Sequence, residues 1–515
     1  MNPSPQQMEH VSAAGRGPTQ SDSRQGRFSY TTLRTTTMGL LFAAAALWEA
    51  KNLSSLSALS NSDIWWHLRS GLWILQNHAV PHHGLFSQSP DLCWTASNWG
   101  YDVLVAFAFR TLGLRSIPAL LMVSRFALAC VTFLLAGGLR RRFWVAVVLS
   151  AFAQYILGSV QPGPTYVSII WFALALLLLN QSRATGSLRI LFWLPPLFLV
   201  WANLDIQFVY GIALLALFMG ISFLPFWRPV EGECQLEQKR TVVSLTEVAI
   251  ITALCVIATC STPYSYHLYA VFFASGTSPA SHYLSDFAAM GFRQPQDYAL
   301  MLLTMAAFLA LGLRHSRDVF QIALLTACMI LSFYAQRTGW LAVLAAILVI
   351  AGAARDTSGT ADIDCQRSWK RRVLMVGIVS LAMVVLAAAL EIPRSDQALL
   401  AKASPTYPVA ACNYIREHRL PQPLFTSYEW GGFLTWYLPE YPVAIDGRTG
   451  LYENEFVLEY FKAMNAEVSY KSYGAMANAN TILLPQTSLM GEALKTMPAF
   501  RVEYSDSVAV VLTKP

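Results

Sequence analysis

Long apolar stretches, separated by short polar segments, recur along most of this chain. They lie at 34–52, 117–137, 142–158, 163–181, 189–203, 207–226, 244–261, 298–313, 318–334, 339–354 and 372–390. Each approaches the roughly 20 residues that a helix needs to cross the hydrocarbon core of a bilayer. The pattern predicts an α-helical polytopic membrane protein with about eleven transmembrane helices. The apolar stretch at 101–113 is shorter, and we expect it to form an interfacial helix.

Lysine and arginine gather in alternate connecting segments, as expected when short cytoplasmic loops carry the positive charge. This bias predicts a cytoplasmic N-terminus and, with an odd number of spans, an outer location for everything after residue 391. Residues 1–33 are polar and rich in Ser and Gln, which predicts a disordered cytoplasmic tail followed by an uncleaved signal anchor. The topology fits a bacterial inner membrane with the C-terminal domain in the periplasm.

The composition changes near Pro393, where the membrane domain (34–391) gives way to a C-terminal segment, 396–515. In this segment short apolar runs alternate with helix-like stretches, which predicts a small extracytoplasmic α/β domain. The expected strands are 424–427, 443–446, 481–485 and 508–512, and the expected helices are 453–463 and 487–496. The first outer loop, 53–116, is also long, and long loops beside a bilayer often build a site.

The overall composition supports a membrane protein, because 55% of the residues are hydrophobic and only 13% are charged. The net charge of +6 reflects the loop bias, and no basic patch with interleaved aromatic residues points to nucleic acid. The eight cysteines form no CxxC pair. Cys93 and Cys412 lie outside the predicted spans, so a disulfide between them is allowed but not favoured.

The stretch SDIWWHLRSG follows the first apolar run and concentrates chemistry at a membrane boundary. On a helix Asp63 and His67 share one face at the i, i+4 spacing, with Trp66 on the same stripe and Arg69 close by. This combination indicates a site containing an acid, a base and a cation. The alternative is an interfacial anchor in which the tryptophans float the helix at headgroup level.

Further polar residues occur on the predicted outer side. They are Asn203 and Asp205, Asp286 and Arg293, and Arg337. Ionisable groups near a membrane are costly unless paired, so they are candidates for function. Guanidinium groups suit a lipid-linked phosphate, and a carboxylate suits the proton of an attacking hydroxyl. Each residue taken singly also fits an ion pair or a snorkelling anchor.

In order and topology these motifs resemble a bacterial branch of the GT-C glycosyltransferases, membrane enzymes that move sugars from polyprenyl-phosphate carriers. The matching residues are Asp63, Trp66, His67 and Gly71, Pro81, Phe86 and Ser87, Trp94 and Trp99, the stretches 201–205 and 262–269, Arg337, and the tail stretch 428–452. The resemblance implies an inverting transfer in which Asp63 activates an acceptor hydroxyl and Arg69, Arg337 and His67 neutralise the donor phosphate. The resemblance also implies an acceptor that is a glycan, a lipid or a protein.

Some positions depart from the family pattern. Gly84 stands where an acid is usual, an acid near Trp99 is displaced to Asp102, and Gln161 replaces a common basic residue. These departures bear on acceptor contacts and on the divalent metal that some relatives bind, so we assign no metal ligands.

The tail contributes its own candidates, Trp430, Gly431, Asp446 and Arg448. Asp446 is expected to follow a strand, a usual place for functional groups, but a turn closed by its side chain and paired to Arg448 explains the same residues. Two other functions remain open for the whole chain. One is a transporter or flippase of a lipid-linked or polar substrate, and the other is a non-catalytic scaffold for envelope assembly.

Overall fold

The computed structural model describes residues 32–44, 59, 61–138, 143–222, 245–277, 287–313, 318–353, 363–448 and 450–514. Residues 1–31 of the expected disordered tail lie outside these ranges, as do Asp286 and the end of the first predicted span. Residues 32–44 are helical.

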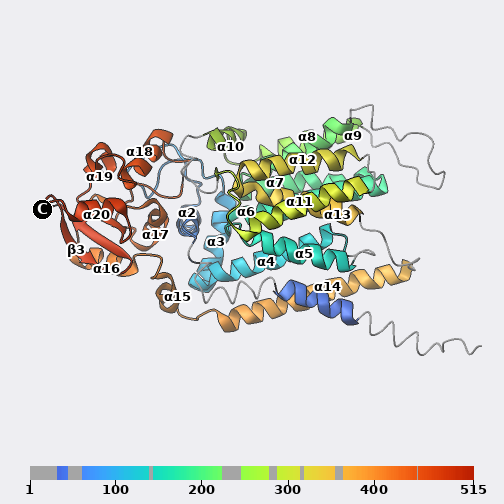
Figure 1. Ribbon diagram of the computed structural model, residues 1–515, viewed down its shortest axis with the longest axis horizontal. Coiled ribbons are helices and arrows are strands. Elements are labelled where there is room, and N and C mark those ends of the chain that lie inside the picture. The colour runs from blue at the N-terminus through green and yellow to red at the C-terminus, as the bar shows by residue number, and fades with distance from the viewer. Residues whose placement is uncertain are drawn as a thin grey trace, which may run out of the picture.

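A bundle of long helices makes up most of the molecule (Figure 1). Its members are α4 (Ser116–Leu135), α5 (Phe143–Leu157), α6 (Pro164–Thr185), α7 (Leu194–Leu204), α8 (Phe208–Ser222), α9 (Leu245–Thr259), α11 (Pro295–Leu313), α12 (Val319–Tyr334), α13 (Gly339–Ala353) and α14 (Ile363–Glu391). The helix at 32–44 packs on α14, since a Cβ on Gly39 would lie in ordinary contact with Val376 at 3.6 Å and Ser380 at 3.7 Å.

Length and composition identify which helices can cross a membrane. Within the described ranges five helical stretches are long and apolar enough, namely Trp99–Leu135, Pro164–Thr185, Pro295–Leu313, Gln336–Ala353 and Arg371–Glu391. Further apolar helices are shorter, at Phe143–Leu157, Leu188–Leu204, Phe208–Ser222, Thr246–Thr259 and Val319–Tyr334. The prediction of a helical membrane protein is confirmed at this level.

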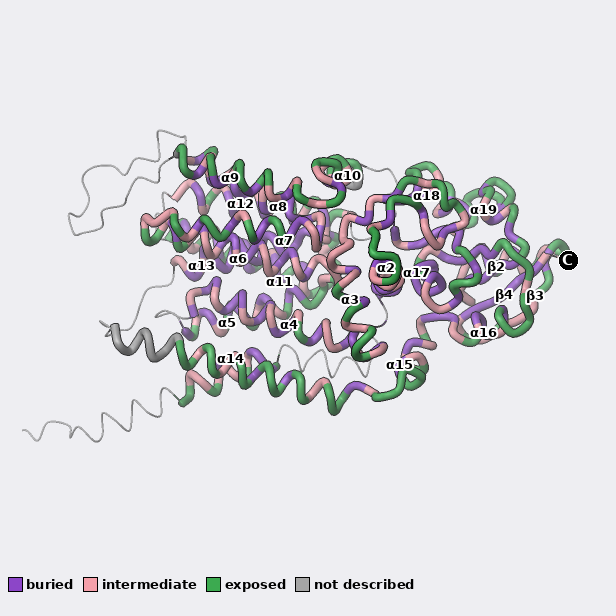
Figure 2. The backbone as a smooth tube through the Cα atoms, turned by 180° about the vertical axis from the view of Figure 1, so that it is seen from behind, coloured by how far each residue is buried: buried purple, intermediate pink, exposed green. Residues whose placement is uncertain are grey.

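Burial differs sharply across the bundle. Almost every residue of α13 is buried, as expected for the apolar centre of a bundle. In contrast α14 lies at the edge, and its apolar side chains Leu374, Met375 and Ile378 are 64%, 52% and 59% exposed (Figure 2). A long helix that exposes apolar side chains in this way is typical of contact with lipid.

Two helices lie between the bundle and the tail domain. They are α2 (Asp63–Asn77) and α3 (Trp99–Leu112), and they pack against each other (Figure 1). The predicted helix at 101–113 is therefore present, although it runs through the turn η2 (Gly113–Arg115) directly into α4. Its interfacial position stays a prediction. The helix α10 (His267–Thr277) lies near the same end of the bundle.

The tail folds into a sheet with helices around it. The strands β1 (Leu424–Thr426), β2 (Thr481–Pro485), β3 (Arg501–Ser505) and β4 (Ala509–Thr513) follow the order β1-β2-β4-β3. In this sheet only the pair β1 and β2 is parallel, and the register places Phe425 opposite Ile482. The helices are α15 (Asp396–Ala403), α16 (Val409–His418), α17 (Tyr428–Tyr437), α18 (Asn454–Met464), α19 (Gly474–Ala477) and α20 (Leu489–Lys495).

Most of the expected tail elements are present in the structure. The strands at 424–427, 481–485 and 508–512 and the helices at 453–463 and 487–496 are confirmed within a few residues. The strand predicted at 443–446 is wrong, because only Val443 makes a bridge, to Ser87 of the first outer loop. The disulfide that was allowed between Cys93 and Cys412 is not formed, since both thiols are free.

Candidate active site

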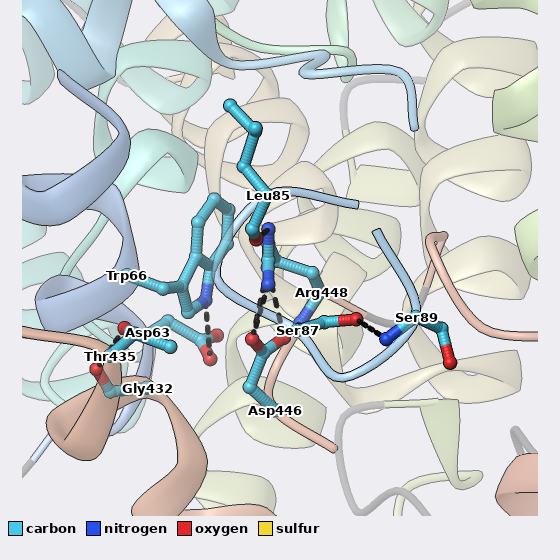
Figure 3. Close-up of polar contacts among 9 residues, drawn as sticks. All are labelled: Asp63, Trp66, Leu85, Ser87, Ser89, Gly432, Thr435, Asp446 and Arg448. Atoms are coloured by element: carbon cyan, nitrogen blue, oxygen red, sulfur yellow. Dashed lines mark hydrogen bonds and ion pairs between the residues drawn. The ribbon is translucent and has the colours of Figure 1, made fainter. Parts of the chain in front are cut away.

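The N-terminus of α2 presents the Asp63 carboxylate. Asn61 Oδ1 accepts a hydrogen bond from the backbone N–H of Asp63 at 2.9 Å, and the Asn61 amide donates to the Pro162 carbonyl before α6. One turn along, Trp66 Nε1 donates to Asp63 Oδ1 at 3.2 Å (Figure 3). The first turn of a helix favours a negative charge, so this position stabilises the ionised carboxylate. The helix therefore holds Asp63 at the junction of bundle and tail.

His67 shares the face of Asp63 but meets a different partner. Its Nδ1 lies 2.5 Å from Asp102 Oδ1 on α3, and both side chains are buried. The close approach of α2 and α3 is possible because residue 71 is glycine, where a Cβ would overlap the Asp102 carbonyl. The displaced acid Asp102 thus fixes the orientation of a buried imidazole.

Arg69 lies half-buried on α2 and faces Phe86, in the segment between α2 and α3. Its guanidinium stands 4.9 Å above the ring centroid of Phe86, which is a cation–π distance. Burial lowers the pKa of Arg69, which nevertheless stays cationic in any ordinary buffer. The Phe86 backbone has a φ of 70°, a left-handed conformation that a bulky residue adopts only when its neighbours hold it.

Asn203 and Asp205 lie between α7 and α8, at the end of the bundle near α3. Asn203 Oδ1 accepts a hydrogen bond from Trp99 Nε1 at 3.1 Å, which ties this end of α7 to α3. Asp205 Oδ2 accepts one from Ser168 at 2.5 Å. Burial raises the pKa of Asp205 to about 6, against the lowering effects of the Ser168 hydrogen bond, the Gln207 backbone hydrogen bond and the charge of Arg337.

Arg337 belongs to the turn η7 (Gln336–Thr338), and its guanidinium lies 4.1 Å from the ring centroid of Phe287. Its charge lowers the pKa of Asp205, so the two side chains lie within electrostatic reach of each other. Arg293 is exposed, and the Asp297 carboxylate caps the start of α11 by accepting from the Arg293 backbone N–H at 3.2 Å. Asp286, its predicted neighbour in this outer segment, lies outside the described residues.

The tail places Asp446 and Arg448 against the first outer loop. Arg448 Nε and Nη2 donate to the Asp446 carboxylate at 3.0 and 2.7 Å, and its Nη1 donates to the Leu85 carbonyl at 2.7 Å (Figure 3). The pair is fully buried, and the guanidinium lies 4.8 Å from a ring centroid of Trp94. Asp446 also accepts from the Arg448 backbone N–H, so it closes a turn as well as an ion pair.

Trp430 and Gly431 lie on α17, and their contacts are within the tail. Trp430 Nε1 donates to the Thr406 carbonyl at 3.0 Å, so the indole supports the tail internally. A Cβ on Gly431 would overlap the Ile445 carbonyl, which explains the glycine by close packing of α17 on the segment before Asp446. Gly84, where the family pattern has an acid, also meets the tail, since a Cβ there would lie 3.1 Å from Leu451.

Three further residues shape the site. Asn61, Gly432 and Gly447 act through backbone approach or capping, and the two glycines meet partners from distant segments. The sequence offered two hints, the paired glycines at 431–432, which allow close backbone approach, and the DGR sequence at 446–448. Gln161, another departure from the family pattern, is exposed just before α6. Across the described ranges no three His, Cys, Asp or Glu side chains could together hold a metal ion.

Comparison with known proteins bears on the fold. No protein-family model matches the chain, and no curated protein matches it. Among solved structures it is similar to the oligosaccharyltransferase of Archaeoglobus fulgidus, determined with a tethered acceptor peptide that contains the NVT sequon. The sequences are 12% identical, the TM-score is 0.51, and the match covers 87% of this chain and 69% of that chain. The protein therefore shares the fold of that oligosaccharyltransferase.

Proposed function

We propose that the protein is a membrane glycosyltransferase of GT-C type that moves a sugar from a polyprenyl-phosphate donor to an acceptor hydroxyl. The observation that carries the proposal is the Asp63 carboxylate at the first turn of α2, at the junction of the bundle and the tail. The GT-C fold supports glycosyl transfer in general terms. The remaining parts of the proposal are about eleven spans, a cytoplasmic N-terminus, a periplasmic tail and a bacterial inner membrane.

In the proposed reaction Asp63 accepts the proton of the acceptor hydroxyl as its oxygen attacks the anomeric carbon of the donor sugar. The bond from that carbon to the phosphate oxygen breaks on the opposite face, so the configuration inverts. The polyprenyl phosphate leaves with the bonding electrons and gains negative charge. Arg69 and Arg337 neutralise that charge, as guanidinium groups do for phosphates, and His67 adds to the local positive potential when protonated.

The local structure supports Asp63 in this role. A helix N-terminus favours a negative charge, as a general base requires, and Trp66 Nε1 donates to one of the carboxylate oxygens at 3.2 Å. The guanidinium of Arg69, two turns along the same helix, is held over the Phe86 ring. A ring face leaves the N–H donors at the edge of the guanidinium plane available for a phosphate.

The test is sugar transfer from a polyprenyl-phosphate sugar by membranes that contain the intact protein or the Asp63→Asn variant at equal level. Loss of a general base is expected to reduce the rate about 10² to 10⁴-fold. Asp91→Asn is the matched control, because Asp91 is an exposed carboxylate of the same loop. Equal transfer by the intact protein and Asp63→Asn contradicts the role of Asp63. Absence of any transfer favours the transporter and scaffold alternatives.

A further inference from the structure

The tail backbone lies directly against the Asp63 carboxylate. A Cβ placed on Gly447 would overlap Asp63 Oδ1 and would lie 3.0 Å from Trp66 Nε1. The second contact comes from α17, where a Cβ on Gly432 would lie 2.6 Å from the Ser62 carbonyl and 3.3 Å from Trp66 Cδ1. Neither glycine has a positive φ, so both are required for space and not for conformation. The tail thus encloses the start of α2 on two sides.

The residue after Gly447 extends this contact to the cation of the site. Arg448 donates to the Leu85 carbonyl at 2.7 Å, and the Val443 N–H donates to the Phe86 carbonyl at 3.2 Å. These two bonds hold the backbone on either side of Phe86, which has its strained φ. The Phe86 ring in turn lies beneath the Arg69 guanidinium. A chain of contacts therefore leads from Arg448 through Phe86 to Arg69.

We propose that the tail segment Asp446–Arg448 is a positioning element of the active site, in which Gly447 sets the place of the Asp63 carboxylate and Arg448 sets the place of Arg69 through Phe86. The inference rests on the proposed function, because it assigns positioning roles for that reaction. The buried Asp446 carboxylate keeps Arg448 in place through two parallel hydrogen bonds, from Nε to Oδ1 and from Nη2 to Oδ2. Neither Gly447 nor Arg448 is a catalytic residue, since each acts through a residue of the first outer loop.

Gly447→Ala tests the contact with Asp63. The added methyl group must displace the carboxylate, and a misplacement of about 1 Å costs on the order of 10²-fold in rate. We expect kcat to fall by about that factor, with the KM for the donor changed less than about twofold, because Asp63 acts on the acceptor proton. Gly450→Ala is the matched control, since a Cβ at Gly450 meets nothing within 4 Å. Equal kcat values for the two variants overturn the proposal.

A double variant separates positioning from a general structural defect. If Gly447 acts through Asp63, adding Gly447→Ala to Asp63→Asn lowers the residual rate no further, because the base is already absent. If the two losses multiply, Gly447 acts elsewhere and the proposal fails.

Arg448→Lys tests the second contact. It keeps the charge but cannot make both the paired bonds to Asp446 and the bond to Leu85, and it is expected to raise the donor KM about tenfold. An unchanged donor KM overturns the Arg69 assignment.

A crosslink tests the geometry without requiring sugar transfer. A Cβ on Gly447 would lie 3.3 Å from Asp63 Cγ. In Asp63→Cys the sulfur would take the position of that Cγ atom. In a disulfide the corresponding separation is about 3 Å, so Asp63→Cys with Gly447→Cys should oxidise readily in membranes. A protease site introduced between α13 and α14 then reports the bond, because the two fragments stay joined until reduced.

The crosslink control is Asp63→Cys with Gly450→Cys, which should yield separate fragments. The same control reveals any bond that the thiol at position 63 forms with a native cysteine. Equal crosslinking in both pairs, or none in either, contradicts the contact. The crosslink also distinguishes failure of the proposed function from failure of the positioning role. If the intact protein transfers no sugar but the thiols introduced at positions 63 and 447 join, the proposed function fails while the contact stands. If sugar is transferred and no bond forms, the positioning role fails alone.

Discussion

The indole of Trp65 on α2 stacks on the indole of Trp436 on α17, with ring centroids 4.9 Å apart and planes inclined by 29°. Phe433 meets the same indole edge to face at 5.1 Å, and Tyr407 does so at 5.6 Å. Trp65 is fully buried, although it neighbours Trp66 in a sequence that suggested a shared interfacial role. Trp65 therefore fastens the tail domain to the helix that carries Asp63.

Trp65→Ala is expected to loosen the tail. Removing a buried aromatic side chain from a core costs about 3–5 kcal/mol, and here the loss falls on the contact between α2 and α17. Limited proteolysis of the purified protein should release the tail several-fold faster than in the intact protein. Trp73→Ala serves as the control, because Trp73 lies on the same helix but is only partly buried. Equal cleavage rates for the two variants would contradict this role of Trp65.

Arg69→Gln is expected to weaken donor binding. The variant keeps a polar side chain but loses the charge that would meet the donor phosphate, which costs about 1.5–3 kcal/mol for a charged hydrogen bond. The donor KM should rise about ten- to a hundredfold in the sugar-transfer assay. Arg110→Gln is the matched control, since Arg110 is an exposed arginine in the last turn of α3. A larger effect of Arg110→Gln would show that the phosphate binds elsewhere.

Gly71→Ala is expected to destabilise the protein through the contact between α2 and α3. The methyl group would overlap the Asp102 carbonyl, so the helices must move apart. Such overpacking costs about 1–3 kcal/mol and should lower the thermal midpoint in detergent. Gly312→Ala on α11 is the comparison, because a Cβ there meets nothing within 4 Å and alanine favours a helix. A midpoint for Gly71→Ala at or above that of the intact protein would refute the packing argument.

Asp205→Asn is expected to change how stability depends on pH. Burial raises the pKa of Asp205 to about 6, so the folded protein prefers the protonated carboxyl. The resulting stabilisation is complete below the unfolded pKa of about 4 and is lost as the pH rises through about 6. The raised pKa corresponds to on the order of 3 kcal/mol at neutral pH.

The asparagine variant keeps an acceptor for Ser168 but has no proton to lose. The thermal midpoint of the variant, relative to that of the intact protein, should therefore rise as the pH is raised from about 4.5 to about 7.5. This range spans the titration of Asp205. Midpoints that run parallel over this range would show that Asp205 has an ordinary pKa.

Local sequence patterns predicted the parts of the fold that depend on local physics. Apolar length identified the bundle helices, and the polar run at 62–71 identified the helix that carries Asp63. The helices at 453–463 and 487–496 were also predicted, because their residue patterns are those of a helix. The strand β3 was missed because Arg501–Ser505 is largely exposed and shows no apolar run, and 443–446 was mistaken for a strand because it is apolar and buried without being paired along its length.

The arrangement around the site required the structure, because it depends on pairs far apart in the sequence. The i, i+4 spacing placed Asp63 and His67 on one face, but it could not show that the His67 imidazole is hydrogen-bonded to Asp102. Likewise the DGR sequence suggested a turn at Asp446, but not that the backbone of Gly447 reaches Asp63. A glycine that is required for close packing can be recognised only when the positions of both packed segments are known.

The pairing of the first outer loop with the tail also sets the order in which the site forms. The Gln88 side chain donates to the Pro442 carbonyl across 354 residues of sequence, beside the bridge between Ser87 and Val443. At a synthesis rate of about 5–20 residues per second, Pro442 is made roughly 20–70 s after Gln88. During that interval the bundle can be assembled while Asp63 still lacks the backbone that encloses it. A newly made chain can therefore assemble its helix bundle first, and the start of α2 is enclosed only when the last domain docks.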